Sequence, residues 1–417
     1  MMKQKMMNRR EFFEKTAGAV AAVSALGSAT DVFAVPPSNR VNLGIIGPGS
    51  RGQALMRAFL RVPGVRFAGV CDVYEPRFAQ AHKITGEDTP TYKDYRQLLE
   101  AKDIDAIVVA TPLSFHEEHV IASLESGRHV YGEKDMAKTV ASCDTVYRAV
   151  KRTGKQYQLG TQYHYAPWFV EALRQIRAGK LGQITQIYAY WHRNNDWRRP
   201  VPNPGDQALE RLINWRMYRE YSGGLLAELG THQILFALEV FGAMPVSVIG
   251  NGNIAYWKDG REVPDNVQVV YSFSAGPTLF FSSTTTNHFE GMKICVYGTG
   301  GTAVLTEAGG TLYYEPARPN SAVPKELVVE HGVVTGASFR AELPYTGPGD
   351  AIKVPEDQAG NADFLACRSF IDCVRNNRHP EADELSAWNS GVMVALGNQA
   401  IETGERIIFA QHATLPG

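Results

Sequence analysis

The fold of this chain is decided by the stretch VNLGIIGPGSRG, residues 41–52. Its first six residues are largely apolar and predict a short buried strand, and three glycines follow at the spacing Gly-x-Gly-x-x-Gly. Residues 53–61 then predict a helix, and residues 65–71 predict a second strand that ends at Asp72. This order of strand, glycines, helix, strand and acid is typical of a dinucleotide-binding unit.

Each residue of the glycine turn has its own expected role toward a dinucleotide. Gly47 permits the tight turn, Gly49 lets the backbone approach the pyrophosphate, and Gly52 lets the helix pack closely on the strand. We expect the pyrophosphate at the N-terminus of the helix, where Ser50 and Arg51 lie.

Asp72, 20 residues after the last of these glycines, indicates which dinucleotide binds. Its carboxylate is placed to accept hydrogen bonds from the adenosine ribose and would repel a 2′-phosphate. Val73 and Tyr74 supply no cation, so NAD is favoured over NADP. Arg51 and Arg77 are near enough in sequence to keep NADP open as the alternative.

Strand and helix patterns continue to alternate as far as residue 160, which implies a parallel sheet with right-handed crossovers. Ligands of such sheets bind at the carboxyl ends of the strands, where Thr111, Pro112, Glu133 and Lys134 lie. The predicted strands are residues 104–110, 129–134 and 156–160, and the predicted helices are residues 92–101 (opened by Thr91), 116–126 and 142–153.

The pattern changes after residue 165. A helix over 167–178 precedes strands of period two, which predict a mainly antiparallel open sheet. Residues 316–360 are rich in Pro, Gly and charge and predict an extended loop or arm. The predicted strands are residues 184–191, 246–251, 266–273, 278–285, 292–298 and 303–307, and the last predicted helices are residues 364–376 and 387–403.

The first 34 residues predict an export signal. Arg9 and Arg10 form a twin-arginine pair, residues 16–29 are apolar but too short and weakly hydrophobic to span a bilayer, and cleavage is expected after Ala34. The alternative is an ordinary amphipathic N-terminal helix. On the export interpretation we expect a periplasmic or otherwise exported protein.

The patterns of the remaining chain predict a protein of class α/β. We expect a Rossmann domain over 35–160 and an α+β domain over 161–417.

Composition excludes several classes of protein. The 417 residues carry a formal net charge of -1, which argues against a nucleic-acid or membrane-surface partner. The 5 cysteines are scattered without Cys-x-x-Cys spacing, so neither a zinc site nor a disulfide framework is predicted, and Cys71 is expected to be a small buried hydrophobe.

Several pieces together carry a family resemblance. They are residues 47–52, the Ala-Thr-Pro-x-x-x-His stretch at 110–116, Glu133-Lys134, the Gly-Lys-Leu-Gly at 179–182 and GGLLAELGTH at 223–232. In this order the chain resembles the Gfo/Idh/MocA oxidoreductases, the group of glucose–fructose oxidoreductase and inositol dehydrogenase. The resemblance implies a homo-oligomer (dimer or tetramer), and it adds Thr111, Pro112, His116 and Glu133 to the expected cofactor contacts.

The resemblance also implies the catalytic residues. Family members have Glu-Lys-Pro where this chain has Glu133, Lys134 and Asp135, and the lysine reaches substrate and nicotinamide. An ammonium there can stabilise a developing alkoxide or, if neutral, take a proton. Family members also carry an acid four residues before a histidine on a helix, here Glu228 and His232.

His232 is the expected general base, because the ordinary pKa of histidine suits proton transfer near neutral pH. Glu228 is expected to orient His232 or to bind a substrate hydroxyl. The pair could also bind a metal, but we find no third ligand and predict no metal.

Further substrate contacts are expected from Tyr163, His164, Arg198 and His288. Family members often have an arginine near Tyr163 and His164. Arg198 lies in a polar and aromatic loop over 191–200, whose Trp faces and Arg and Asn donors suit a sugar, or whose arginines suit a carboxylate.

We therefore expect an exported NAD-dependent oxidoreductase that acts on a hydroxyl of a sugar, glycoside or cyclitol. Its NAD should be tightly bound and recycled, since a dissociable cofactor would be diluted after export. One alternative is a glycosidase or lyase that works by transient oxidation, elimination and re-reduction. The second is a non-catalytic ligand-binding or sensor protein, because Asp135 and Glu228 depart from the family pattern.

Overall fold

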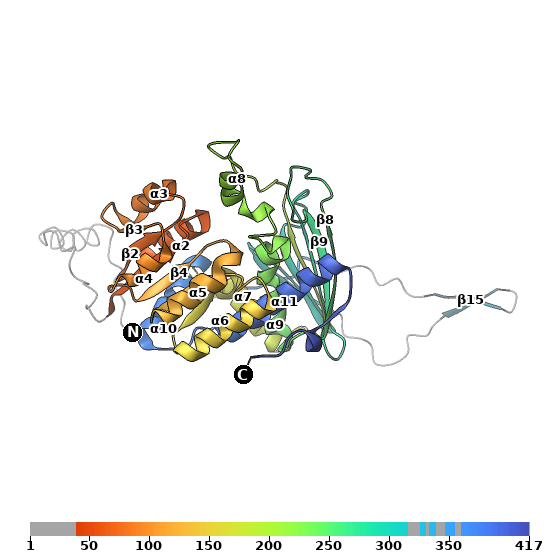
Figure 1. Ribbon diagram of the computed structural model, residues 1–417. Helices are drawn as coiled ribbons and strands as arrows, with labels where there is room; N and C mark the ends of the chain where they lie inside the picture. Colours follow the sequence, from red (N-terminus) through yellow and green to blue (C-terminus); the bar gives the residue numbers. More distant parts are fainter. Residues whose placement is uncertain (1–38, 316–325, 331–332, 339–346, 355–359, 417) are drawn as a thin grey trace, which may run out of the picture. The chain divides into compact units, whose positions relative to one another are not determined.

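The computed structural model describes residues 39–315, 326–330, 333–338, 347–354 and 360–416 (Figure 1). The predicted export signal, residues 1–34, lies outside the described residues. Among the residues described, no helix combines the length and apolar character that a membrane crossing needs. All five cysteines are buried and free, as predicted for Cys71.

The first sheet has six strands in the order β3-β2-β1-β4-β5-β6, and all of its strand pairs are parallel. This is the strand order of a dinucleotide-binding Rossmann sheet, and it confirms the predicted fold class. The strands are β1 (Val41–Ile46), β2 (Val65–Cys71), β3 (Thr91–Tyr92), β4 (Ala106–Val109), β5 (His129–Glu133) and β6 (Tyr157–Gly160).

Five helices alternate with these strands, and two of them differ from prediction. The helix expected over 92–101 begins later, because Asp94 caps it by accepting from the Arg96 N–H, and Thr91 belongs to β3. The helix α3 escaped prediction because only Ala81 of its ten residues is buried, which leaves no apolar period. The helices are α2 (Ser50–Leu60), α3 (Pro76–Thr85), α4 (Tyr95–Glu100), α5 (His116–Glu125) and α6 (Val140–Thr153).

The second sheet has nine strands in the order β16-β13-β12-β11-β7-β10-β9-β8-β17. Its pairs are antiparallel except β7 with β10, so the predicted mainly antiparallel sheet is confirmed. Its strands are β7 (Ile184–His192), β8 (Ser247–Asn253), β9 (Asn266–Ser272), β10 (Thr278–Thr284), β11 (Met292–Gly298), β12 (Gly301–Thr306), β13 (Gly309–Tyr314), β16 (Asp350–Ala351) and β17 (Ile407–Ile408).

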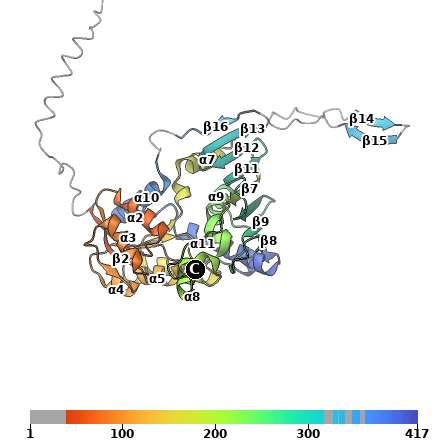
Figure 2. The same ribbon diagram turned by 90° about the horizontal axis from the view of Figure 1, so that it is seen from above.

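The segment predicted as a loop or arm, residues 316–360, contains three strands. β14 (Glu326–Glu330) and β15 (Val333–Ser338) pair as an antiparallel hairpin, and β16 joins the edge of the second sheet (Figure 2). Residues 326–330 and 333–338 therefore form strands where an extended loop or arm was predicted, because runs rich in valine form strands despite the Pro and Gly around them.

Helices at the end of the chain pack against elements of the first sheet. In α10 (Ala362–Asn376), Phe370 packs 6.1 Å from Phe59 of α2 and 5.6 Å from Tyr131 of β5. In α11 (Glu384–Thr403), the Trp388 indole donates to Asp144 of α6 over 2.7 Å, and the Met393 carbonyl accepts from Tyr271 of β9 over 2.8 Å. The helix α11 therefore ties the first sheet to the second.

Candidate active site

Two adjoining cavities lie at the carboxyl ends of the first sheet. The one we name the nucleotide cavity has a volume of about 450 Å³ and is lined by the glycine turn, Asp72, Thr111 and Pro112. The one we name the central cavity has a volume of about 610 Å³ and is lined by Lys134, Glu228 and His232, among others. The residues that line both are Arg51, Ala110, Thr111, Arg199, Trp215 and Arg216, so the two cavities share a wall.

The glycine turn has room for a ligand at one position only. A Cβ at Gly47, whose φ is 92°, would lie 2.7 Å from the Ala110 oxygen, and a Cβ at Gly52 would lie 2.2 Å from the Gly47 oxygen. A Cβ at Gly49 would meet nothing within 4 Å. Gly49 also opens α2, which has no side-chain cap and no acid in its first turn. The turn thus fits a pyrophosphate at an uncapped helix N-terminus.

Asp72 is held firmly at the end of β2. Its side chain is 3% exposed and accepts from the Tyr74 N–H over 2.8 Å and from Arg77 over 2.9 Å. Arg77 was one of the two cations that left NADP binding as an alternative, because a cation can bind the 2′-phosphate of NADP. In the structure its charge is balanced by Asp72. The geometry therefore suits NAD, whose ribose hydroxyls can share the carboxylate.

Arg51, the other such cation, is also paired. Its guanidinium donates to Glu133 and Asp363 over 2.7 Å each and to Gln162 over 3.2 Å. Burial lowers the pKa of Arg51, but Glu133, Tyr131 and Asp363 outweigh burial and raise it. Arg51 lines both cavities, but its charge is neutralised by ion pairs with Glu133 of β5 and Asp363 of α10, which join these elements to α2.

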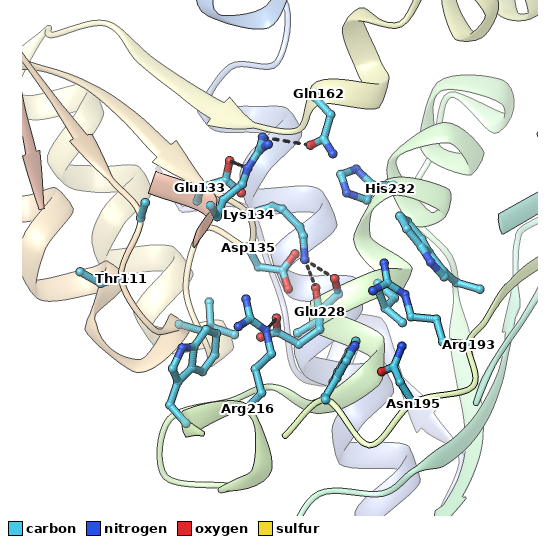
Figure 3. A pocket seen from close by; sticks show the side chains of 18 of the residues that line it. Thr111, Glu133, Lys134, Asp135, Gln162, Arg193, Asn195, Arg216, Glu228 and His232 are labelled. Atoms are coloured by element: carbon cyan, nitrogen blue, oxygen red, sulfur yellow. Dashed lines mark hydrogen bonds and ion pairs between the residues drawn. The ribbon is translucent and has the colours of Figure 1, made fainter. Parts of the chain in front are cut away.

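Lys134 reaches from the end of β5 toward the second sheet's helices. Its Nζ donates to the Ala227 carbonyl over 2.8 Å and to the Glu228 carbonyl over 2.6 Å (Figure 3). The Glu228 carboxylate accepts from Arg216 over 2.8 Å. Residues Leu226–Gly230 form a π-helical turn (η5) before α9 (Thr231–Phe241), so Glu228 and His232 do not share a regular α-helix as predicted.

His232 lines the central cavity and is 4% exposed. Its Nδ1 lies 3.0 Å from the Thr161 hydroxyl, and its ring packs 4.7 Å from Tyr163 and 5.6 Å from Trp191. Burial lowers the pKa of His232 well below its usual value, and Lys134 and Arg51 lower it further. The imidazole is therefore neutral at neutral pH, and the nitrogen that does not face Thr161 is available to accept a proton.

Asp135 stands where the family pattern has proline. It is 1% exposed and follows a cis peptide bond from Lys134. One carboxyl oxygen accepts from the Thr231 hydroxyl, and the other has no partner among the described residues. Burial raises the pKa of Asp135 to about 7, so the carboxyl is partly protonated at neutral pH.

Glu133, Tyr163, His116 and Arg198 were also predicted and also line the central cavity. The Tyr163 hydroxyl donates to Glu307, and its ring stacks 5.7 Å from Trp191. His116 places its ring nitrogens 2.6 Å from the Asp135 carbonyl and 3.0 Å from the Thr111 carbonyl, so it holds the loops after β4 and β5 together. Arg198 is paired with Glu210 and Asp259.

Two predicted residues lie elsewhere. His164 is buried against Tyr165 and Phe169, with Nε2 3.9 Å from Glu381, and does not line the cavity. The 3-10 turn η3 (Gln162–Tyr165) explains this, because it turns adjacent side chains in different directions. His288 is exposed in the turn after β10, where its carbonyl accepts from the Gly291 N–H. The structure therefore does not bring His164 or His288 to the central cavity with the other predicted residues.

Sequence reasoning missed several lining residues. Arg216, Glu307 and Gln162 reach the central cavity from three separate segments. Gln162 lies next to a residue that was predicted, but Arg216 and Glu307 belong to no motif. What marks them as site residues is the contact of Arg216 with Glu228 and of Glu307 with Tyr163, and these contacts exist only in the folded chain.

Two consecutive parts of the chain match family models of known proteins. Residues 41–161 match the model of the oxidoreductase family with an NAD-binding Rossmann fold, and residues 169–304 match the GFO/IDH/MocA C-terminal domain. Among curated proteins, the alpha-N-acetylgalactosaminidase of Shewanella oneidensis is 27% identical over 235 residues, which are 50% of this chain and 50% of that protein. The chain spans about half the length of the curated relatives it matches.

Solved structures share the fold over most of the chain. An aldose-aldose oxidoreductase from Caulobacter crescentus, complexed with glycerol, is 20% identical with a TM-score of 0.68 and covers 89% of this chain and 100% of its own. A levoglucosan dehydrogenase in complex with NADH is 19% identical with a TM-score of 0.69 and covers 88% of this chain and 99% of its own. At these identities the likeness shows a shared fold.

Proposed function

Because the chain belongs to the Gfo/Idh/MocA family of oxidoreductases and carries its NAD-binding domain, we propose that it oxidises or reduces a CH–OH group of a sugar, glycoside or cyclitol. The observation that carries this proposal is the wall shared by the two cavities. Thr111 belongs to this wall, so NAD held at the glycine turn and Asp72 would adjoin a substrate held beside Lys134 and His232. When bound, NAD accepts or returns the hydride.

The chain's own residues handle the proton. His232, neutral and buried, takes the proton of the reacting hydroxyl when the alcohol is oxidised and returns it in the reverse direction. Lys134 has three N–H donors, of which two are bound by the Ala227 and Glu228 carbonyls. The third stabilises the negative charge that develops on the substrate oxygen.

One wall of the central cavity suits a carbohydrate. Trp191, Trp197 and Tyr163 line the cavity, and aromatic side chains in a cavity can pack against the C–H groups of a sugar ring. In the same cavity, Arg216 donates to the Glu228 carboxylate over 2.8 Å. That carboxylate has acceptor capacity left for a substrate hydroxyl.

The proposal includes retained NAD. Arg199, from a loop of the second domain, donates to the Ser50 hydroxyl of the glycine turn over 2.7 Å. A bridge across the nucleotide cavity would slow release of the cofactor, as recycling in an exported enzyme requires. Export itself is proposed from Arg9 and Arg10, and replacing both with lysine should hold the protein in the cytoplasm.

The test uses protein purified without added nucleotide. Denaturation should release near-stoichiometric NAD or NADH, identified by mass spectrometry. Sugars, glycosides and cyclitols are then added to the native protein, and absorbance of the reduced nicotinamide is followed. Reduction of bound NAD by a member of the panel supports the proposal. Binding of a ligand without any reaction would contradict it and favour a sensor protein.

A second candidate is a redox-neutral glycosidase of the same fold. It is favoured by the similarity to an alpha-N-acetylgalactosaminidase, and its transient oxidation needs the same NAD, His232 and Lys134. Nitrophenyl N-acetylgalactosaminide and related glycosides, offered without added NAD, separate the two. Release of the aglycone with no net change in the redox state of NAD identifies the glycosidase.

A further inference from the structure

Arg193 enters the central cavity from the end of β7. Its backbone N–H is fixed to the Thr284 carbonyl over 2.8 Å. Its guanidinium carbon lies 5.4 Å from the ring centre of Trp191 and 5.8 Å from that of Trp197. Arg193 and Asn195 reach into the cavity from the side opposite Glu133 and Thr111 (Figure 3).

The charge of Arg193 has no counter-ion within the described part of the chain. Of the four other arginines of the cavity, Arg51, Arg198 and Arg216 each hold at least one carboxylate. The fourth, Arg199, donates to the Ser50 hydroxyl. The side chain of Arg193 makes neither an ion pair nor a hydrogen bond to any residue described, and its contacts are the two indole faces.

Two carboxylates act on Arg193 from a distance, and each already has a donor. Glu307 accepts from the Tyr163 hydroxyl, and Glu228 accepts from Arg216. Burial lowers the pKa of Arg193, but an arginine starts above 12 and stays charged. The cavity therefore keeps a partly desolvated cation whose N–H edge is free, and such a charge is costly unless an anion joins it.

We propose that Arg193 recognises a carboxylate on the substrate, so that the carbohydrate bound here is an acid such as a uronic or aldonic acid. Stacking on an indole uses the face of a guanidinium and leaves its in-plane donors for a bidentate pair with a planar carboxylate. A monoanion is favoured over a phosphate because Glu307 and Glu228 lie near enough to repel a second negative charge. The identity of the reaction rests on the proposed function, but the binding preference does not.

The experiment compares acids with their neutral counterparts on NAD-loaded protein. D-Glucuronate and D-glucose, and D-galacturonate and D-galactose, are titrated by calorimetry into wild type, Arg193→Gln and Arg66→Gln. Arg66 is 62% exposed in a pair with Asp103 and controls for net charge. Thermal melting and NAD content establish that each variant is folded and loaded.

We expect wild type and Arg66→Gln to prefer the acid of at least one pair by about tenfold or more, which is the worth of one charge-assisted hydrogen bond pair. The ratio should fall toward one in Arg193→Gln. An equal or reversed preference in wild type, or a preference that survives in Arg193→Gln, overturns the inference. The wild-type ratio decides even if Arg193→Gln does not fold.

The two proposals fail separately. Oxidation of neutral sugars without any preference for acids would support the proposed function and contradict carboxylate recognition by Arg193. Acid-selective binding without NAD reduction by any sugar would support the role of Arg193 and contradict the oxidoreductase.

Discussion

The ammonium of Lys134 donates to the backbone carbonyl of Glu228 over 2.6 Å, which joins the end of β5 to the π-helical turn that precedes α9. The contact crosses 94 residues of chain and brings the proposed electrophilic group to the helix that carries His232. Sequence distance alone does not indicate such a contact, and the first prediction tests it.

Lys134→Met should lower turnover by about a hundredfold or more, as expected when a group that stabilises developing charge is lost. It should also move the acid limb of the pH–rate profile to higher pH, because Lys134 is one of the charges that lower the pKa of His232. The profile of residual activity measures both effects. Lys138→Met removes a lysine outside the central cavity and should change neither. An unmoved acid limb would mean that Lys134 does not act on His232.

Gly49→Ala and Gly52→Ala should separate cofactor binding from folding. Gly52→Ala places a Cβ 2.2 Å from the Gly47 oxygen and should lower the melting temperature sharply. Gly49→Ala meets nothing in the protein, and its φ of -68° suits alanine, so the melting temperature without NAD should stay unchanged. NAD should nevertheless be absent from purified Gly49→Ala. Normal NAD content in this variant would place the pyrophosphate elsewhere.

Asp72→Ala should weaken NAD and relax discrimination against NADP. The substitution removes the acceptor for the ribose and frees Arg77, whose guanidinium now lies 2.9 Å from the carboxylate. We expect a loss of NAD affinity of about tenfold or more, on the scale of hydrogen bonds to a charged group. Calorimetry with both nucleotides measures the two affinities. The double variant Asp72→Ala, Arg77→Ala is the control, and it should bind NADP more weakly than Asp72→Ala.

Asp135→Asn should stabilise the protein in a pH-dependent way. The folded pKa of about 7 lies above the ordinary 3.8, so the folded state keeps a proton that the unfolded chain gives up between these values. The contribution of Asp135 to stability is therefore full below 3.8 and is lost as the pH rises through 7. Asparagine avoids this loss, and the gain in unfolding free energy above pH 7 should be on the order of 4 kcal/mol.

Denaturant unfolding on both sides of neutral pH measures that gain, which should shrink in acid. Asp103→Asn, at an aspartate that is 59% exposed, should show no comparable gain. A gain for Asp135→Asn that is the same at every pH would contradict a carboxyl that is buried and protonated.

Residues with roles set by their immediate neighbours were predictable from the sequence. Gly52 is required by a contact within its own turn, to the Gly47 oxygen, and the strand order follows from the alternation of elements. Site residues that were predicted only because they are neighbours in the sequence were predicted less reliably. Tyr163 lines the cavity while its neighbour His164 faces the interior, and only the geometry of the 3-10 turn decides between them.

The sequence also did not predict the pKa shifts of the site residues, because these depend on the electrostatic environment in the folded chain. His232 was expected to titrate near its ordinary value, but full burial beside Lys134 lowers its pKa well below that value. Asp135 was noticed only as a missing proline, and the raised pKa comes from its burial next to Thr231. Both properties depend on which elements cover the residue after folding.

The proton role of His232 is the central claim, and a single-turnover measurement tests it most directly. NAD-loaded wild type and His232→Ala are mixed with the best sugar of the panel, and reduction of bound NAD is followed by stopped flow. With NAD content equal in the two proteins, His232→Ala should react at least about a hundredfold more slowly, as expected for loss of a general base. Equal rates in the two proteins would contradict the account.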